Sequence, residues 1–296
     1  MFVLPRHFGI YLLLFFTAII WGGTFAAGKL ASFEAQPLSA ALWRFILALI
    51  ILAPQAFKEG LIKKFTLKTV ILLVLSGLTG LVLYNYFFIK GLALTGAGRG
   101  AVIVTVNPVF IYLGAIIFFH ERVTFLGIVG MFLAVLGTVC VVTSGKFFSI
   151  FTEEFNVGDI LMVGCVFSWT IYSLLGKVLL VKISPIIANT WATVIAIVLL
   201  IPLCILVGEP LNAFVSYSFS TWLSLAFLGI FGSAMGFTFF YKGILILGPS
   251  RTAVFITLVP FFGILSGAVI HGEIVQAPEI IGLFISLAGL TIIQKN

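Results

Sequence analysis

A pattern of 24 residues occurs twice in this chain, and this repeat restricts the possible folds more than any other feature. The two copies, residues 87–110 and 239–262, match at a constant offset of 152 positions. Identical pairs join Lys90, Gly91, Gly96, Arg99, Ala101, Val102, Thr105 and Pro108 to Lys242, Gly243, Gly248, Arg251, Ala253, Val254, Thr257 and Pro260. Further pairs, such as Trp21 with Trp169, follow at an offset of 148. The chain is therefore built from two copies of one architecture.

Apolar runs of about 20 residues, the length that crosses a bilayer as an α-helix, fill nearly the whole chain. Of the 296 residues, 62% are hydrophobic and only 8% are charged, whereas a soluble domain has about 25% charged residues. The runs do not alternate between apolar and polar residues, as the strands of a membrane barrel would. The sequence predicts an all-α integral membrane protein with no soluble domain and no nucleic-acid partner.

Ten candidate membrane spans are bounded by charged residues, Gly or Pro. They cover 10–31, 38–57, 69–90, 98–119, 124–144, 158–180, 185–207, 220–241, 252–270 and 278–294. The repeat assigns five spans to residues 1–150 and five to residues 151–296. Because five is odd, the second unit must cross the membrane upside down relative to the first. The predicted fold is ten transmembrane helices in two inverted five-helix repeats, which is typical of secondary transporters with a substrate site near the repeat interface.

The distribution of Lys and Arg predicts that both termini are cytoplasmic. In that orientation the cytoplasmic segments hold Arg6, Lys58, Lys63, Lys64, Lys68, Arg122, Lys177, Lys182, Lys242, Arg251 and Lys295. The opposite side holds Lys29, Lys90, Arg99 and Lys146 with the acidic Glu153, Glu154, Asp159 and Glu209. The short basic loop from Lys58 to Lys68 decides the orientation most strongly.

Several motifs along the chain have a family counterpart. They are WGGTF at 21–25, Pro37 and Arg44 in the second span, the Gly-rich third-to-fourth junction, Asn107–Pro108, Glu121, and Gly127, Gly130 and Gly137. Together they resemble the EamA-type members of the drug/metabolite transporter superfamily over nearly the whole chain. The resemblance implies a ten-helix transporter in the cytoplasmic membrane of a prokaryote that moves small metabolites, often amino acids, outward. It also implies a central cavity lined mainly by helices three, four, eight and nine, with one and six contributing.

Polar residues inside the spans are the first candidates for substrate contact, because a central charged residue opposes insertion by about 2.5 to 3.5 kcal/mol. Asn107 offers an amide, and Pro108 frees a backbone carbonyl one turn earlier; Pro260 is its repeat counterpart in a span that also holds Thr257. An alternative is that Asn107 only bonds a neighbouring helix and that Pro108 and Pro260 only set kinks. Arg44 has no charged counterpart and is the best candidate to meet a carboxylate, with interfacial snorkelling as the alternative.

Aromatic residues form the second group of candidates for the substrate pathway. They are Trp21, Tyr84, Phe88, Trp169, Tyr172, Phe237 and Tyr241. Tyr84 and Phe88 share one helical face, as do Phe237 and Tyr241. An aromatic wall with polar groups suits an apolar or aromatic metabolite, although most of the 32 Phe residues must face lipid or neighbouring helices. Departures from the repeat, Asn107 against Val259 and Tyr84 against Gly236, are expected to mark the substrate side.

Other chemistries lack their sequence patterns. The chain has no P-loop, G-x-S-x-G or H-E-x-x-H motif, so we expect no cofactor and no enzymatic activity. His7, His120 and His271 lack metal-ligand spacing, and we expect no metal site. No span holds a central Asp or Glu, so proton coupling is not predicted, and facilitated diffusion and exchange remain open.

Two functional classes follow from the sequence. The first is an exporter of small metabolites, most simply amino acids that are aromatic or apolar, working by alternating access through a central cavity. Its partners would be a small-molecule substrate and the lipid bilayer; a monomer is compatible with this, and the oligomeric state stays open. The second is a membrane-embedded binding, lipid-moving or assembly protein without small-molecule turnover, because a fold alone does not determine a function.

Overall fold

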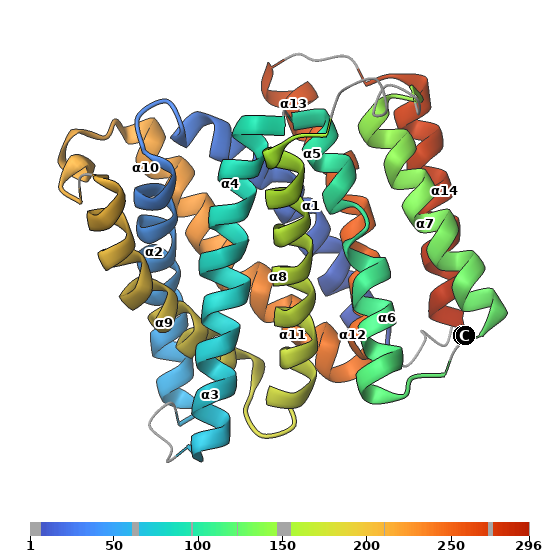
Figure 1. Ribbon diagram of the computed structural model, residues 1–296, viewed down its shortest axis with the longest axis horizontal. Helices are drawn as coiled ribbons and strands as arrows, with labels where there is room; N and C mark the ends of the chain where they lie inside the picture. Colours follow the sequence, from blue (N-terminus) through green and yellow to red (C-terminus); the bar gives the residue numbers. More distant parts are fainter. Residues whose placement is uncertain are drawn as a thin grey trace.

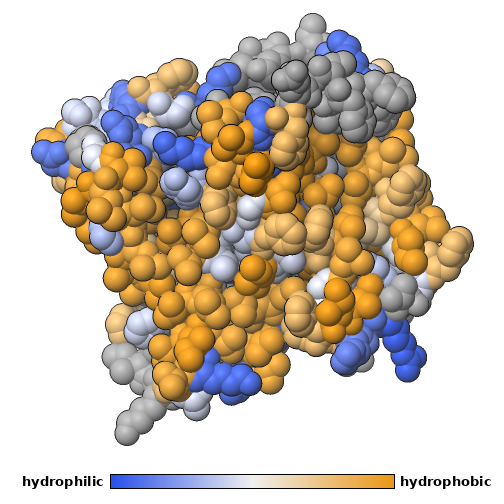
Figure 2. Space-filling view, viewed as in Figure 1, coloured by the Kyte–Doolittle hydropathy of each residue, from blue (hydrophilic) through white to orange (hydrophobic). Residues whose placement is uncertain are grey.

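Ten helices in the computed structural model are long and apolar enough to cross a membrane. The structure describes residues 7–60, 65–95, 97–122, 124–146, 155–209, 211–271 and 275–295. Within these ranges all regular secondary structure is helical (Figure 1). A broad apolar band separates two more polar ends of the surface (Figure 2). The predicted fold class, an all-α membrane protein with ten spans, is confirmed.

The first repeat contains five spans, of which the third and fourth are divided into segments. They are α1 (Phe8–Ala31), α2 (Pro37–Lys58), α3 (Leu67–Ser76) with η1 (Gly77–Leu83) and α4 (Tyr84–Thr95), α5 (Ala97–Val104) with α6 (Asn107–Phe119), and α7 (Phe125–Thr143). Gly96, between α4 and α5, lies outside the described residues, as do Arg6, Lys63, Lys64, Glu153, Glu154 and Glu273.

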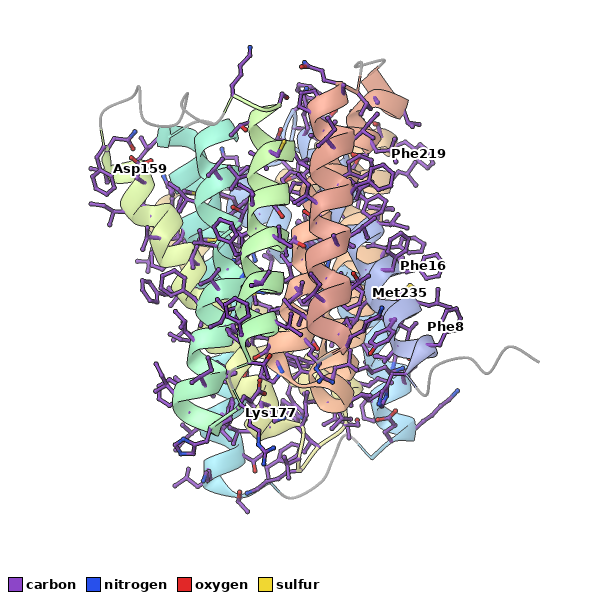
Figure 3. All side chains as sticks on the ribbon, turned by 90° about the vertical axis from the view of Figure 1, so that its right-hand side faces the viewer. Phe8, Phe16, Asp159, Lys177, Phe219 and Met235 are labelled. Carbon is purple, nitrogen blue, oxygen red and sulfur yellow. The ribbon has the colours of Figure 1, made fainter. Side chains whose placement is uncertain are left out.

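The second repeat has the same order of elements. Its spans are α8 (Val157–Leu179), α9 (Pro185–Val207), α10 (Phe219–Ala226) with η4 (Phe227–Met235) and α11 (Gly236–Leu247), α12 (Pro249–Ala253) with η5 (Val254–Leu258) and α13 (Val259–His271), and α14 (Ala277–Lys295). A short 3₁₀ turn, η3 (Ala213–Ser216), lies in the loop before α10. Figure 3 shows α8 running from Asp159 near one end of the molecule to Lys177 near the other.

The eighth and ninth spans are longer than predicted. We expected them to be separated by residues 242–251, but α11 reaches Leu247 and α12 begins at Pro249. The single residue between them, Gly248, has φ +87°. Glycine adopts this left-handed conformation without the steric penalty of a side chain, so one residue is enough to reverse the chain.

Both repeats contain a π-helical segment at the same place in their third span, a feature that the sequence did not predict. These segments are η1 in the first repeat and η4 in the second. π-Helical turns are rare and are found mostly at functional sites. Each of the two spans therefore changes its helical geometry near the middle of the bundle.

The described carboxylates all lie at helix ends. Both oxygens of Glu209 accept hydrogen bonds from the Leu38 and Ser39 amides at the start of α2, at 3.2 and 2.7 Å. This arrangement matches the favourable position of a negative charge at a helix N-terminus. The remaining carboxylates and their partners are Glu34 with the Ser218 amide, Glu59 with Ser184, Glu121 with Ser250, Asp159 with the Asn156 amide, and Glu279 with Ser144 and the Gln276 amide. The interior of the bundle is left without a described acidic group.

The fifth and tenth spans pack against each other along glycine-containing faces. In Figure 1, α7 and α14 lie side by side at one edge of the molecule. A Cβ atom on Gly282 would lie 2.6 Å from the Gly137 carbonyl oxygen, so the backbones approach too closely for a side chain. Small residues allow such contacts in membranes.

Candidate substrate site

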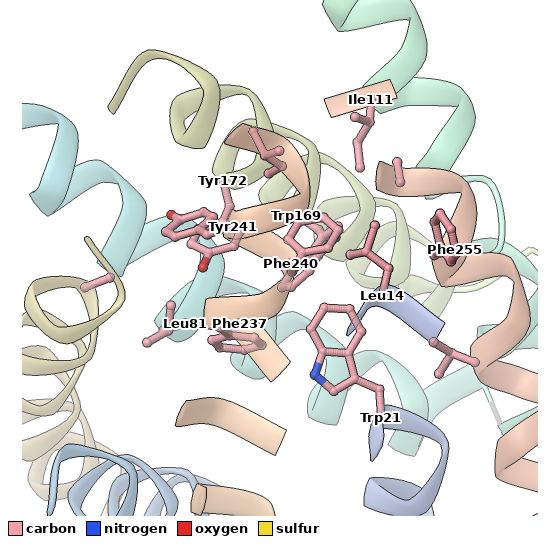
Figure 4. Close-up of a cluster of buried hydrophobic side chains, with 14 of the residues drawn as sticks. Leu14, Trp21, Leu81, Ile111, Trp169, Tyr172, Phe237, Phe240, Tyr241 and Phe255 are labelled. Atoms are coloured by element: carbon pink, nitrogen blue, oxygen red, sulfur yellow. The ribbon is translucent and has the colours of Figure 1, made fainter. Parts of the chain in front are cut away.

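Aromatic side chains from both repeats meet at the centre of the bundle. The Trp21 ring of α1 lies 5.4 Å from the Trp169 ring of α8 and 5.8 Å from the Phe237 ring of α11. Trp169 is 5.7 Å from Phe237 and 5.4 Å from Phe240. Figure 4 shows these four side chains together. Edge-to-face and tilted pairs at such distances are favourable for aromatic rings.

The cluster extends beyond Trp169 through two further pairs of rings. The Tyr84 ring lies 5.1 Å from Trp169 and stacks on Phe88 at 5.9 Å. On the other side, Tyr172 lies 5.1 Å from Trp169 and stacks on Tyr241 at 4.9 Å. The structure thus brings together all the aromatic residues that the sequence singled out. Their part in transport stays a prediction.

Phe240 belongs to this cluster although the sequence reasoning omitted it. Its ring lies 5.5 Å from Trp21, and the side chain is 1% exposed. Residues three apart share a helix face, so its spacing from Phe237 was a signal that could have identified it. The large number of Phe residues concealed that signal.

Arg44 reaches the same centre from α2. Its Nε atom donates a hydrogen bond to the Ser233 hydroxyl of η4 at 2.6 Å, and its Cζ atom lies 5.8 Å from the centre of the Phe237 ring. The side chain is only partly buried. A Cβ atom on Gly229 would lie 2.6 Å from the Arg44 carbonyl oxygen, so this glycine permits the close approach of η4 that carries Ser233 to the guanidinium.

Three consecutive carbonyl groups of the η4 segment accept hydrogen bonds from side chains of other helices. Trp21 Nε1 donates to the Gly232 oxygen at 3.0 Å. Asn189 Nδ2, on α9, contacts the Ser233 and Ala234 oxygens at 3.2 and 3.3 Å. Buried backbone polar groups need such partners in a membrane interior. The sequence reasoning missed Asn189, a polar residue near the start of an apolar span.

The two symmetry-related tryptophans differ in their hydrogen bonding. Trp169 Nε1 is buried and has no hydrogen-bond acceptor among the described residues, whereas Trp21 Nε1 is bonded. The Trp169 side chain is 4% exposed. A buried donor without an acceptor costs free energy unless a ligand or water supplies one.

The half of the cluster nearer the termini is sealed. Tyr172 and Tyr241 are 0% exposed. Their hydroxyl groups interact with each other, and that of Tyr241 also lies beside Ser76, but without a hydrogen bond of standard geometry. A void beside Trp21 has a volume of about 10 Å³, which is room for about one water molecule. In contrast, Arg44 and Tyr84, toward the opposite end, are partly accessible.

The remaining predicted residues lie at breaks in the spans. The fourth span is interrupted between Val104 and Asn107, and Pro108 lies in the first turn of α6. Asn107 is 1% exposed and its Oδ1 atom lacks a described partner. Within the described ranges, no hydrogen bond joins the Asn107 side chain to the aromatic cluster. Pro260 follows the 3₁₀ segment η5 and lies in the first turn of α13.

Thr257 bonds to α7, and no hydrogen bond among the described residues joins it to the aromatic cluster. It is 3% exposed, its hydroxyl donates to the Val254 oxygen at 2.6 Å, and its carbonyl accepts from Thr138 at 3.0 Å. Both polar groups of Thr257 thus have partners within the protein. These bonds indicate that Thr257 holds the ninth span against the fifth.

Comparison with known proteins identifies relatives along the whole chain. The model of the EamA-like transporter family matches residues 8–143 and 156–294. An uncharacterized transporter, YyaM, of Bacillus subtilis is 29% identical over 96% of this chain and 93% of its own length. A probable terminal-alkyne amino-acid exporter of Streptantibioticus cattleyicolor is 22% identical over 95% of this chain and 91% of its own length.

A solved crystal structure has the same fold. It aligns with a TM-score of 0.76 over 95% of this chain and 97% of its own, at 18% sequence identity. At this identity the likeness concerns the fold alone. It indicates that the ten-helix arrangement of this chain is one that an experimentally determined protein adopts.

Proposed function

Because this chain belongs to the EamA-like transporter family, a family of membrane transporters, we propose that it exports small metabolites through the centre of its bundle. Amino acids are the substrates that the relative from Streptantibioticus suggests by its name. Export would proceed by alternating access between the two repeats. The chain would act in the cytoplasmic membrane of a prokaryote with both termini in the cytoplasm.

The observation that carries this proposal is the position of the aromatic cluster. Trp21 and Trp169 are symmetry mates from the first helix of each repeat, and their rings touch at the interface between the repeats. In inverted-repeat transporters this interface holds the substrate. Arg44 and Asn189 add polar groups to a core that is otherwise apolar, and a few convergent polar groups in an apolar setting are typical of small-molecule sites.

Hydrogen bonds between spans at the end of the bundle nearer the termini support a gate at that end. The Ser250 hydroxyl of α12 donates to Glu121 at 2.5 Å, and Gln294 Nε2 donates to the Arg251 carbonyl at 2.9 Å. These bonds join the start of the ninth span to the ends of the fourth and tenth. Opening would require them to break, while the π-helical segments and Gly248 provide places where the spans can bend.

Release from liposomes tests this proposal. Purified protein would be reconstituted into liposomes preloaded with labelled amino acids and related metabolites. We expect faster release than from protein-free liposomes, and slower release from Trp169→Ala and Asn107→Ala variants that remain folded. No release across a broad panel would reject the export function and favour the alternative of a binding or assembly protein. Unchanged release rates in both variants would show that the substrate site does not include Trp169 or Asn107.

A further inference from the structure

We propose that the site selects organic monocarboxylates with an apolar body, and that Arg44 binds the carboxylate. This inference rests on the proposed function, because it names the chemical class that the central site would carry. An α-ammonium group on the substrate is not required by it. The argument depends on the charge, the free hydrogen-bond donors and the apolar walls around Arg44.

The Arg44 guanidinium carries a positive charge that no described acidic group neutralises. A guanidinium stays protonated at neutral pH and has five N–H donors. Ser233 takes one of them, from Nε, and the four on Nη1 and Nη2 have no acceptor among the described residues. The described carboxylates all contact groups at helix ends, such as Glu209 at the start of α2. Arg44 therefore keeps its positive charge, and its Nη1 and Nη2 groups remain free to donate two parallel hydrogen bonds to one carboxylate.

The position of the Arg44 guanidinium is fixed inside the bundle, where its free N–H groups can bind a substrate. Arg44 lies about two turns inside α2, and its side chain is partly exposed. The bond to Ser233 at 2.6 Å and the contact with the Phe237 ring at 5.8 Å hold the guanidinium at the cluster. A side chain that snorkelled to the membrane surface would make neither contact. Bidentate pairing with a planar carboxylate is the strongest interaction available to such a fork.

A second donor lies beside the same ring. Trp169 is 5.7 Å from Phe237, and its Nε1 atom is buried without a described acceptor. Arg44 and Trp169 thus both lie next to the Phe237 ring, and both have unused N–H groups. Both donors would be satisfied by an oxygen-bearing anion, and neither by a cation.

The walls of the site determine the rest of the substrate. Trp21, Tyr84 and Phe237 each contact the Trp169 ring, and these four side chains suit an aromatic or branched apolar group. No described carboxylate lies among them to pair with an ammonium group. A neutral amide would forfeit the charge-assisted pair, and an amine would be repelled by Arg44.

Binding to matched compounds tests the inference without requiring transport. Binding of 3-phenylpropionate, 3-phenylpropanamide and 3-phenylpropylamine to the purified protein would be measured by calorimetry and by tryptophan fluorescence. We expect the acid to bind at least about tenfold more tightly than the amide, a difference of about 1.4 kcal/mol, and the amine not to bind. Equal affinity for the acid and the amide, or tighter binding of the amine, would overturn the inference.

Variants connect the preference to Arg44. Arg44→Gln should remove the preference for the acid over the amide, and Arg44→Lys should retain part of it, because lysine keeps the charge without the bidentate fork. Lys29→Gln, which removes an exposed cation at the end of α1, should leave binding unchanged. A folded Arg44→Gln protein that keeps the full preference would contradict the assignment. If Arg44→Gln does not fold, the assignment is still tested by comparing the preference of Arg44→Lys for the acid over the amide with that of the wild-type protein.

The same compounds separate the inference from the proposed function. Selective binding of the acid without release of labelled acid from liposomes would reject export and leave the inference standing. Release of amines or neutral metabolites, with no preference for acids in binding or release, would uphold export and reject the inference.

Discussion

At the scale of single residues, two positions that the repeat makes equivalent have different roles. Trp21 Nε1 donates to the Gly232 oxygen, and Trp169 Nε1 has no acceptor among the described residues. The offset of 148 residues identified the two as a pair, but it could not predict this difference. The Gly232 carbonyl of η4 lies within reach of Trp21 Nε1, whereas no described acceptor lies within reach of Trp169 Nε1 although the first repeat also contains a π-helical segment. Tyr84 beside Trp169, where the second repeat has Gly236, is the corresponding difference in packing.

Phenylalanine substitutions should separate the two tryptophans. Trp21→Phe leaves the buried Gly232 carbonyl without its donor and should destabilise the protein by about 1 to 3 kcal/mol. Trp169→Phe removes a donor that has no protein partner and should cost less than about 1 kcal/mol of stability, while weakening substrate binding. Unfolding in mixed micelles of detergent and denaturant measures the first effect, and titration with substrate measures the second. Equal losses of stability would contradict the assigned hydrogen bonds.

At the scale of secondary-structure elements, the two π-helical segments and the glycine contacts determine how the spans pack. The sequence predicted ten spans, and their bounds agree with the structure within a few residues except at the end of the third span, where α4 reaches Thr95, and around Gly248. The π-helical segments were not predicted, because the apolar periodicity of a span does not distinguish them from an α-helix. Asn189 was missed for the same reason, since its partners are carbonyl groups that only the π-helical geometry exposes.

Asn189→Leu should destabilise the eighth span. The substitution keeps the approximate volume but removes the amide that contacts the Ser233 and Ala234 oxygens and the Thr238 hydroxyl, so we expect a loss of about 1 to 3 kcal/mol. The matched control is Thr190→Val, one residue along α9, because the Thr190 hydroxyl bonds only within its own helix. Thermal unfolding of the detergent-solubilised variants measures both. Asn189→Leu with the stability of Thr190→Val would show that these bonds do not support the span.

Gly282→Leu should separate α7 from α14. Its side chain would begin 2.6 Å from the Gly137 carbonyl oxygen, and overpacking of this kind costs about 1 to 3 kcal/mol or more. Gly9→Leu is the control, since a Cβ atom there meets nothing within 4 Å. The yield of monodisperse protein by size-exclusion chromatography and its thermal midpoint should fall only for Gly282→Leu. A similar decrease for both variants would indicate a general effect of leucine.

At the scale of the whole molecule, the repeat predicted the inverted arrangement correctly because an odd number of spans allows no other. The sequence could not predict which end of the pathway is closed. Closure depends on contacts between distant segments, such as Glu121 with Ser250, and the sequence does not show which distant segments meet. The resemblance to transporters indicated a central cavity, whereas the structure has a packed aromatic cluster at the centre of the bundle.

Breaking the contact at the closed end should increase access to it. In a background without native cysteines, Thr252→Cys introduces a thiol at a position that is 0% exposed. Adding Ser250→Ala, which removes the hydrogen bond to Glu121, should raise the rate of alkylation by a water-soluble maleimide several-fold. Ser220→Ala, an exposed serine at the start of α10, is the control and should not change that rate. An unchanged rate with Ser250→Ala would exclude this contact as part of a gate.

The central claim is that solute passes Trp169 between the two repeats, and chemical blockage of that position tests it most directly. Trp169→Cys and Phe167→Cys would each be reconstituted without native cysteines. Phe167 lies two residues away on α8 and is 47% exposed. After reaction with a bulky thiol reagent, release of labelled substrate should stop for Trp169→Cys and continue for Phe167→Cys. Substrate should also slow the reaction at position 169 alone. Undiminished release through a fully modified Trp169→Cys protein would contradict the account.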